Sequence, residues 1–155
     1  MTRAALLACV LAASAVSPAR AQPARVAALE LTSVDARGIV IEQSARTVIR
    51  DSAAWLGLWK TWSKGKAPPP VDFQKSTVIV VARGWTSSTG YSMVVDSVIE
   101  YADRVNVHIK SVVPGPCPPQ FVANYPQSLV LVPARAKPVY FRERTEAACP
   151  PDWGN

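Results

Sequence analysis

His108 is the one histidine of this chain and therefore its first candidate for acid–base chemistry or metal binding. A metal site needs several convergent ligands, and no second histidine is present to supply one. A Ser-His-Asp triad would pair His108 with Ser88 or Ser92, but neither serine stands in a G-x-S-x-G motif. We therefore expect no catalytic residue and no metal site, and interpret His108 as a solvent-facing strand residue.

The acidic and glycine residues give no stronger case for catalysis. Acidic side chains at strand starts and turns commonly hydrogen-bond their own backbone. Four of them have that setting: Asp72, Asp96, Glu100 and Asp103. Gly84 and Gly90 form no phosphate-binding motif, because neither G-x-x-x-x-G-K-[ST] nor G-x-G-x-x-G is present. We expect a protein that uses no cofactor and is not an enzyme.

Residues 84–95 are the most distinctive segment, with small hydroxyl residues and two aromatic residues between two strand-like runs. Such a segment offers hydrogen bonds and contact surface, but no acid, base or activated nucleophile. It is typical of recognition and not of catalysis. We predict that it binds a protein partner through Trp85, Thr86, Ser87, Ser88, Thr89, Gly90 and Tyr91.

The N-terminus is typical of an export signal. Arg3 gives a positive start, residues 4–16 are small and apolar, and Ala19-Arg20-Ala21 matches the A-x-A cleavage pattern. The apolar run is shorter than the roughly 20 residues that span a bilayer, and no later segment is long enough to do so. We predict cleavage after residue 21, which leaves a secreted or periplasmic protein without a transmembrane segment.

A lipoprotein is the alternative exported form. Leu6-Leu7-Ala8-Cys9 resembles a lipobox, but only five residues separate Arg3 from Cys9. An apolar signal core usually has about 7–15 residues. We therefore favour the cleaved form without a lipid.

Composition places residues 22–155 in one strand-rich domain. Loss of Arg3 and Arg20 with the signal lowers the formal net charge from +6 to about +4. The remaining basic residues form no run of five like charges, so we interpret them as solvated surface and expect no nucleic-acid partner. The 14 prolines of the chain limit helices, because proline lacks a backbone donor.

Cys117 and Cys149 are the two cysteines that remain after signal cleavage. An even number in an oxidising compartment predicts a disulfide. The closed loop of about 32 residues would stabilise the fold by roughly 3–4 kcal/mol on the chain-entropy model. Two free thiols or a metal pair are the alternatives, but zinc would need further ligands.

One amphipathic helix is expected after Asp51-Ser52, whose side-chain oxygens can cap its first turn. Gly65 and three prolines at 68–70 end it. Three tryptophans could form a carbohydrate platform, but apolar residues at helical spacing more often form a buried face. The apolar stripe consists of Trp55, Leu58, Trp59 and Trp62.

The rest of the chain is expected to form strands. Residues 77–82 are apolar at nearly every position, which predicts a central strand covered on both faces. Residues 104–110 alternate and should bury Val105, Val107 and Ile109, with a turn at 101–104 before them. Further strands are expected at 26–34, 38–43, 46–50, 91–99, 128–132 and 139–142, the first two as a hairpin. The expected fold class is α+β: a predominantly antiparallel sheet, sandwich- or barrel-like, with one helix packed on it.

Three short motifs follow one another in a recognisable order. Asp72-Phe73 precedes the strand at 77–81, Gly90-Tyr91-Ser92 starts the next one, and Asn124-Tyr125-Pro126 precedes the strand at 129–133. This order, over about residues 46–143, resembles the C-terminal domain of the PrcB family. The resemblance implies a subunit that associates with and stabilises a protease in a bacterial surface complex.

The chain departs from that family at one position. The family typically has Thr-Gly-Gly-Tyr where this chain has Ser88-Thr89-Gly90-Tyr91. Because threonine resists the positive φ that glycine accepts, we expect the turn to be rearranged or shifted by one residue.

A second resemblance covers less of the chain. Residues 87–91 are similar to the end of the Asn-Pro-Thr-Thr-Gly-Tyr/Phe loop of chagasin-like cysteine-protease inhibitors, without its Asn-Pro. We therefore expect an exported, non-enzymatic domain that binds a protein such as a secreted protease. The alternatives are a chagasin-like inhibitor and an envelope adhesion or glycan-binding module.

Overall fold

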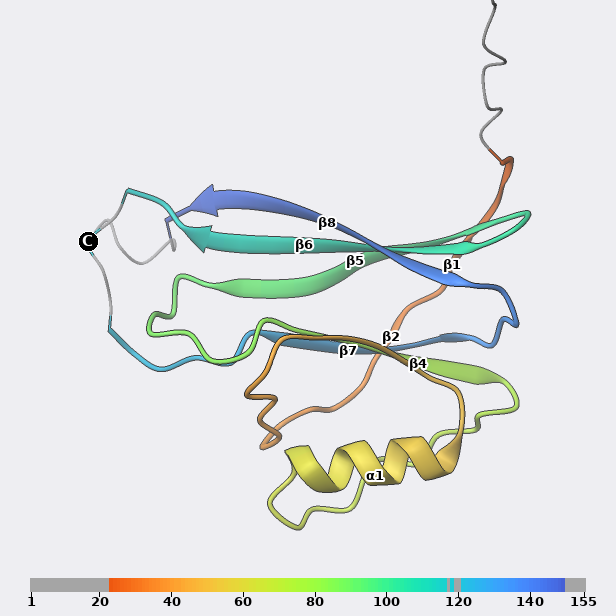
Figure 1. Cartoon of the computed structure of the whole chain (residues 1–155), viewed down its shortest axis with the longest axis horizontal. Helices are drawn as coiled ribbons and strands as arrows, with labels where there is room; N and C mark the ends of the chain where they lie inside the picture. Colours follow the sequence, from red (N-terminus) through yellow and green to blue (C-terminus); the bar gives the residue numbers. More distant parts are fainter. Residues whose placement is uncertain (1–22, 117, 119–120, 150–155) are drawn as a thin grey trace, which may run out of the picture.

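The computed structural model describes residues 23–116, 118 and 121–149. They form two four-stranded sheets that face each other, with a helix below one of them (Figure 1). One sheet has the strand order β1-β5-β6-β8 and the other β2-β7-β4-β3. The elements are β1 (Arg25–Leu29), β2 (Thr32–Ser33), β3 (Ala45–Ile49), α1 (Ser52–Trp62), β4 (Ser76–Ala82), β5 (Ser92–Tyr101), β6 (Val105–Pro114), β7 (Gln127–Pro133) and β8 (Val139–Ala148). The expected α+β class is confirmed, as a sandwich and not a closed barrel.

β4 is an inner strand between β3 and β7, and it contributes to two cores. Because successive side chains of a strand point to opposite faces, Ile79 and Val81 pack between the sheets. Val78, Val80 and Ala82 pack against the helix on the other face. The prediction of a central strand covered on both faces is confirmed.

The helix begins and packs as its sequence predicts. Asp51 is the N-cap, and its Oδ1 accepts a hydrogen bond from Ala54 N at 2.8 Å. Trp55 and Trp59 are 2% and 4% exposed, with ring centroids 4.9 Å apart. Their indole nitrogens donate to the carbonyl oxygens of Pro69 and Lys66 at 3.2 and 2.9 Å. These two tryptophans therefore hold the proline-rich connection against the helix and are not accessible to a glycan.

The hairpin expected between residues 26–34 and 38–43 is wrong. β1 pairs with β5 and β2 pairs with β7. The chain therefore passes from one sheet to the other between Leu29 and Thr32. The Gln127 side chain accepts from Ile41 N at 3.2 Å and donates to the Ile39 carbonyl at 3.1 Å. These bonds to a residue far along the chain satisfy backbone groups that a hairpin would have paired.

β5 and β6 form the predicted hairpin, in which Tyr101 N donates to the Arg104 carbonyl at 2.8 Å. Val105, Val107 and Ile109 are buried, also as predicted. β8 is longer than expected and pairs in parallel with β6. It can do so because β7, in the opposite sheet, returns the chain to the end where β6 begins (Figure 1).

A buried carboxylate fastens the crossing from β7 to β8. Glu100 on β5 is 7% exposed. Its Oε2 accepts from Arg135 Nε at 2.8 Å, and its Oε1 accepts from Lys137 Nζ at 2.6 Å. The hydrogen bonds from Arg135 and then Lys137 hold the pKa of Glu100 below its ordinary value.

We expect Glu100→Gln to be less stable than the natural protein at neutral pH, because the two cations lose their charged acceptor. A carboxylate whose pKa is lowered by folding stabilises the fold fully above its unfolded value, near 4.5, and that stabilisation is lost as the pH falls through the lowered value. Urea unfolding should therefore show a difference between the two proteins that is largest at neutral pH and shrinks in acid.

Glu146→Gln is the matched control, since its carboxylate pairs with Lys110 at 3.0 Å but its side chain is 44% exposed. Its loss should be smaller, because an exposed pair contributes little. A loss for Glu100→Gln that does not change with pH would contradict the assignment.

Candidate partner-binding surface

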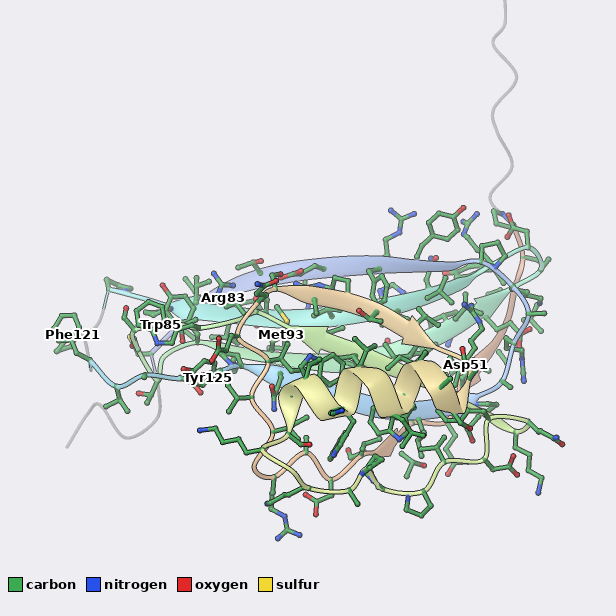
Figure 2. The ribbon with its side chains drawn as sticks, turned by 60° about the horizontal axis from the view of Figure 1, so that its bottom comes forward. Asp51, Arg83, Trp85, Met93, Phe121 and Tyr125 are labelled. Atoms are coloured by element: carbon green, nitrogen blue, oxygen red, sulfur yellow. The ribbon has the colours of Figure 1, made fainter. Side chains whose placement is uncertain are left out.

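The predicted binding segment lies in the loop between β4 and β5 (the β4–β5 loop, residues 83–91). Figure 2 shows Trp85 at one end of the sandwich, with Phe121 and Tyr125 of the loop between β6 and β7 (the β6–β7 loop, residues 115–126). The predicted residues alternate between the two sides of the chain. Trp85, Ser87 and Thr89 are exposed, Thr86, Ser88 and Gly90 are buried, and Tyr91 is half-buried.

Gly84 sets the direction in which the β4–β5 loop leaves β4. Its φ is +87°, and a Cβ built on it would lie 2.7 Å from the Glu42 carbonyl oxygen. The same oxygen accepts a hydrogen bond from Trp85 N at 3.1 Å. Only glycine fits this backbone, and the turn leaves the Trp85 side chain 58% exposed.

A two-way hydrogen bond joins the β4–β5 loop to the β6–β7 loop. Thr86 N donates to the Asn124 carbonyl at 2.8 Å, and Asn124 N donates to the Thr86 carbonyl at 3.0 Å. Thr86 Oγ1 lies within hydrogen-bond distance of the carbonyls of Ser88 and Asn124, at 3.2 and 3.1 Å. The buried Thr86 of the predicted segment therefore holds the two loops together, while Trp85 and Ser87 on either side of it are exposed.

The Asn124 side chain adds a second link between the loops. Its Nδ2 donates to the Tyr91 carbonyl at 3.0 Å, and its Oδ1 accepts from Tyr125 N at 2.8 Å. One side chain thus fixes the start of β5 and the direction of the β6–β7 loop. Sequence analysis used Asn124 only as a family landmark and did not predict this role.

Tyr91 is held by the protein itself. The Arg83 guanidinium carbon lies 4.7 Å from the centroid of the Tyr91 ring, a cation–π geometry. Arg83 also donates to Ser111 Oγ at 3.2 Å, and Ser111 is fully buried. Tyr91 therefore contributes to the structure of this end of the sandwich, whereas Trp85, Ser87 and Thr89 are the exposed residues of the predicted segment.

The turn expected to change at Thr89 does not need a left-handed residue. Among the described residues, positive φ occurs only at glycines: Gly38, Gly65 and Gly84. Neither Thr89 nor Gly90 is one of them, so threonine fits without backbone strain. A Cβ on Gly90 would lie 3.0 Å from Pro114 Cγ, so close packing, and not φ, favours glycine there.

Two exposed apolar residues of the β6–β7 loop were not predicted from the sequence. Phe121 is 81% exposed and Val122 is 54% exposed. They follow a proline-rich segment without any periodic pattern, so no rule for strands or helices marks them. Their lack of a nearby charge is the signal that could have found them.

Other surfaces carry groups that neutralise one another. A hollow of about 510 Å³ beside the helix is lined by Asp35, Arg37, Trp59 and Lys66, among others. Arg37 forms an ion pair with Asp35 at 2.7 Å, and its hydrogen bonds lower the pKa of Asp35 to about 2. His108 lines a smaller hollow beside Arg142 on the outer face of the sheet that contains β8.

Two further properties concern the described part of the chain. No group of three or more His, Cys, Asp and Glu residues there could hold a metal ion. No helix within residues 23–116, 118 and 121–149 is long and apolar enough to cross a membrane.

The predicted bridge and signal peptide fall partly or wholly outside the described residues. Cys117 and residues 1–21 are not described, so the Cys117–Cys149 bridge stays a prediction. Cys149 follows β8, where the Ala148 carbonyl accepts from Gly115 N at 3.0 Å. A Cβ on Gly115 would lie 3.5 Å from Cys149 Sγ. The segment that leads to Cys117 thus begins beside Cys149, which is compatible with a bridge.

These features define a β-sandwich domain with one helix and with two hydrogen-bonded loops at one end. Residues 77–133 match the family model described as PrcB C-terminal. The match runs from β4 to β7 and contains both loops. Over these residues the chain is similar to that family, which confirms the resemblance seen in the sequence. A search of curated proteins found no match, and neither did a search of solved structures.

We expect Asn124→Ala to lower the free energy of unfolding by about 1–3 kcal/mol, because partly buried backbone groups of Tyr91 and Tyr125 lose their partner. Urea denaturation followed by circular dichroism would measure this. Ser87→Ala, at an exposed position of the neighbouring loop, is the control and should change stability by no more than about 0.5 kcal/mol. Equal unfolding midpoints for the two variants would show that the Asn124 side chain does not stabilise the contact between the two loops.

Proposed function

We propose that this chain is an exported, non-enzymatic domain that binds a partner protein, such as a secreted protease, through the β4–β5 loop. The observation that carries the proposal is the exposure of Trp85, at 58%, on a loop fixed by hydrogen bonds to its neighbours. The match to the PrcB C-terminal family supports a role as a protease-complex subunit. The export signal and the absence of a catalytic constellation in the sequence support the rest of the proposal.

The loop is suited to binding because its shape does not depend on the partner. The bonds between Thr86 and Asn124 hold its backbone before any contact is made. A preorganised loop loses less conformational entropy on binding than a flexible one. Tryptophan is also among the residues that contribute most to protein interfaces when they become buried.

The structure refines which predicted residues would touch the partner. Trp85, Ser87 and Thr89 face outward, so the proposed contacts are theirs. Thr86, Ser88 and Gly90 face inward, so their proposed role is to position the outward-facing residues.

Trp85→Ala should weaken partner binding by about 2 kcal/mol or more, or roughly 30-fold in Kd, without unfolding the domain. Affinity capture from the native envelope would identify the partner. Titration of that partner would give the dissociation constants of the natural protein and of the Trp85→Ala variant. Leu56→Ala is the control, because Leu56 is similarly exposed, at 54%, but lies on the helix. Unchanged binding by Trp85→Ala would exclude this loop as the contact.

The two alternative functions give different results with the same purified protein. A chagasin-like inhibitor would block a papain-like protease at stoichiometric concentration. An adhesion or glycan-binding module would bind surface polymers, and among the described residues Trp85 is an exposed tryptophan that could serve it. Co-purification with a protease that stays active would favour the protease-complex subunit.

The intact mass of the exported protein should correspond to a chain that begins at Gln22. Reduction should add two hydrogens, because the predicted bridge between Cys117 and Cys149 opens. A Cys149→Ser variant gains no hydrogens on reduction in this measurement and serves as the control. Two free thiols before reduction would remove the bridge, and a lipid-modified mass that begins at Cys9 would support the lipoprotein.

A further inference from the structure

Two uncharged stretches of the sequence meet at the end of the sandwich that carries the β4–β5 loop. Charged residues make up 18% of the chain, yet none occurs within residues 84–95 or within residues 111–134. The paired bonds between Thr86 and Asn124 bring the described parts of these stretches together. These two stretches therefore lack the charged side chains that other parts of the surface carry, such as the ion pair between Arg37 and Asp35.

Large apolar side chains are exposed on the same loops. Phe121 is 81% exposed, Trp85 58% and Val122 54%. Figure 2 shows Phe121 and Trp85 projecting from the same end of the sandwich. We call Trp85, Phe121 and Val122 the apolar tip. Other exposed large apolar residues of the described part lie on helices and strands, with Val26 on β1, Leu56 on the helix, Val94 on β5 and Tyr140 on β8.

The charge nearest to the tip in sequence is turned toward the sheet. Arg83 precedes the first uncharged stretch, but its guanidinium stacks on the Tyr91 ring at 4.7 Å. It also donates to the buried Ser111 Oγ at 3.2 Å. The cation is therefore engaged with Tyr91 of its own loop and with Ser111 of β6.

We propose that the apolar tip is a docking surface for an uncharged, apolar patch on a partner protein. This inference rests on the proposed function and specifies the chemistry of the partner. The three tip residues carry no charge, and Glu42, whose carbonyl accepts a hydrogen bond from Trp85 N, lines a separate hollow with Trp62 and Lys64. A charged group buried against the tip residues would lose its hydration without compensation. The cores of protein interfaces are likewise poor in charge and rich in aromatic residues.

Association at the apolar tip should be almost independent of salt. In about 0.5 M NaCl the Debye length is only a few ångströms, which removes attraction between exposed charges. Contact between apolar surfaces persists under these conditions. The affinity should therefore change less than about twofold, although the chain as a whole has a positive net charge.

A photo-crosslinking amino acid tests the docking surface in the full-length chain in its native cells. The benzophenone analogue of phenylalanine replaces Phe121 in one protein and Tyr140 in a second. Tyr140 is an exposed aromatic residue, at 49%, on β8 and serves as the matched site. We expect a crosslink to one other protein from position 121 only, with equal yield at low salt and in about 0.5 M NaCl.

Substitutions test the chemistry of the same contact. Val122→Asp in the protein with the probe at 121 should reduce the crosslink at least tenfold, because the new charge would be buried without a partner. Val94→Asp, at an exposed position of β5, should leave the yield within about twofold. Circular dichroism of both variants verifies that they fold.

The remaining outcomes overturn the inference in distinguishable ways. A crosslink from position 140 alone means that a partner exists but docks elsewhere, so the proposed function stands and the apolar tip fails. No crosslink from either position contradicts both. A yield that falls with salt would mean that the partner is charged. A crosslink to a second copy of the chain would mean that the tip forms a dimer interface. Co-sedimentation of the purified protein with phosphatidylcholine vesicles would mean that the tip binds lipid.

Discussion

The structure depends on one strand that is buried on both faces. β4 places Ile79 and Val81 in the core between the two sheets. It places Val78, Val80 and Ala82 in the core between its sheet and the helix. Its alternating side chains therefore connect three layers into one domain. The helix and the sheet of β1, β5, β6 and β8 both pack on its side chains, together with side chains of β7.

The candidate surface derives its rigidity from that strand. β4 ends at Ala82, and Gly84 turns the chain directly from the double-sided core into the β4–β5 loop. Thr86 then binds Asn124, which precedes β7, the neighbour of β4 in the same sheet. The exposed Trp85 thus lies between two points of attachment, so its large accessible area does not imply a loosely held loop.

Local sequence patterns predicted the elements whose contacts are local. The helix follows from the spacing of Trp55 and Trp59, and the β5–β6 hairpin follows from strict alternation and a short turn. The hairpin predicted near Ile39 does not form, because the Gln127 side chain bonds the backbone there. No local sequence pattern could predict a contact with a residue so far along the chain. The same limit explains the site, since Trp85 was predicted from its own loop, whereas the loop of Phe121 is brought beside it by the hydrogen bonds between Thr86 and Asn124. The parallel pairing of β8 with β6 was not predicted, because it depends on β7 running back across the molecule in the other sheet.

The sheet with the strand order β1-β5-β6-β8 places the first and last strands of the described chain on either side of a central hairpin. β5 and β6 are neighbours in sequence, but β1 must be retained from the start of the chain and β8 arrives only at its end. Pairing across such long sequence separations is slow, because loop-closure entropy is lost before the contacts form. The sheet therefore stays incomplete until β8 is available, and until then β6 has an unpaired edge.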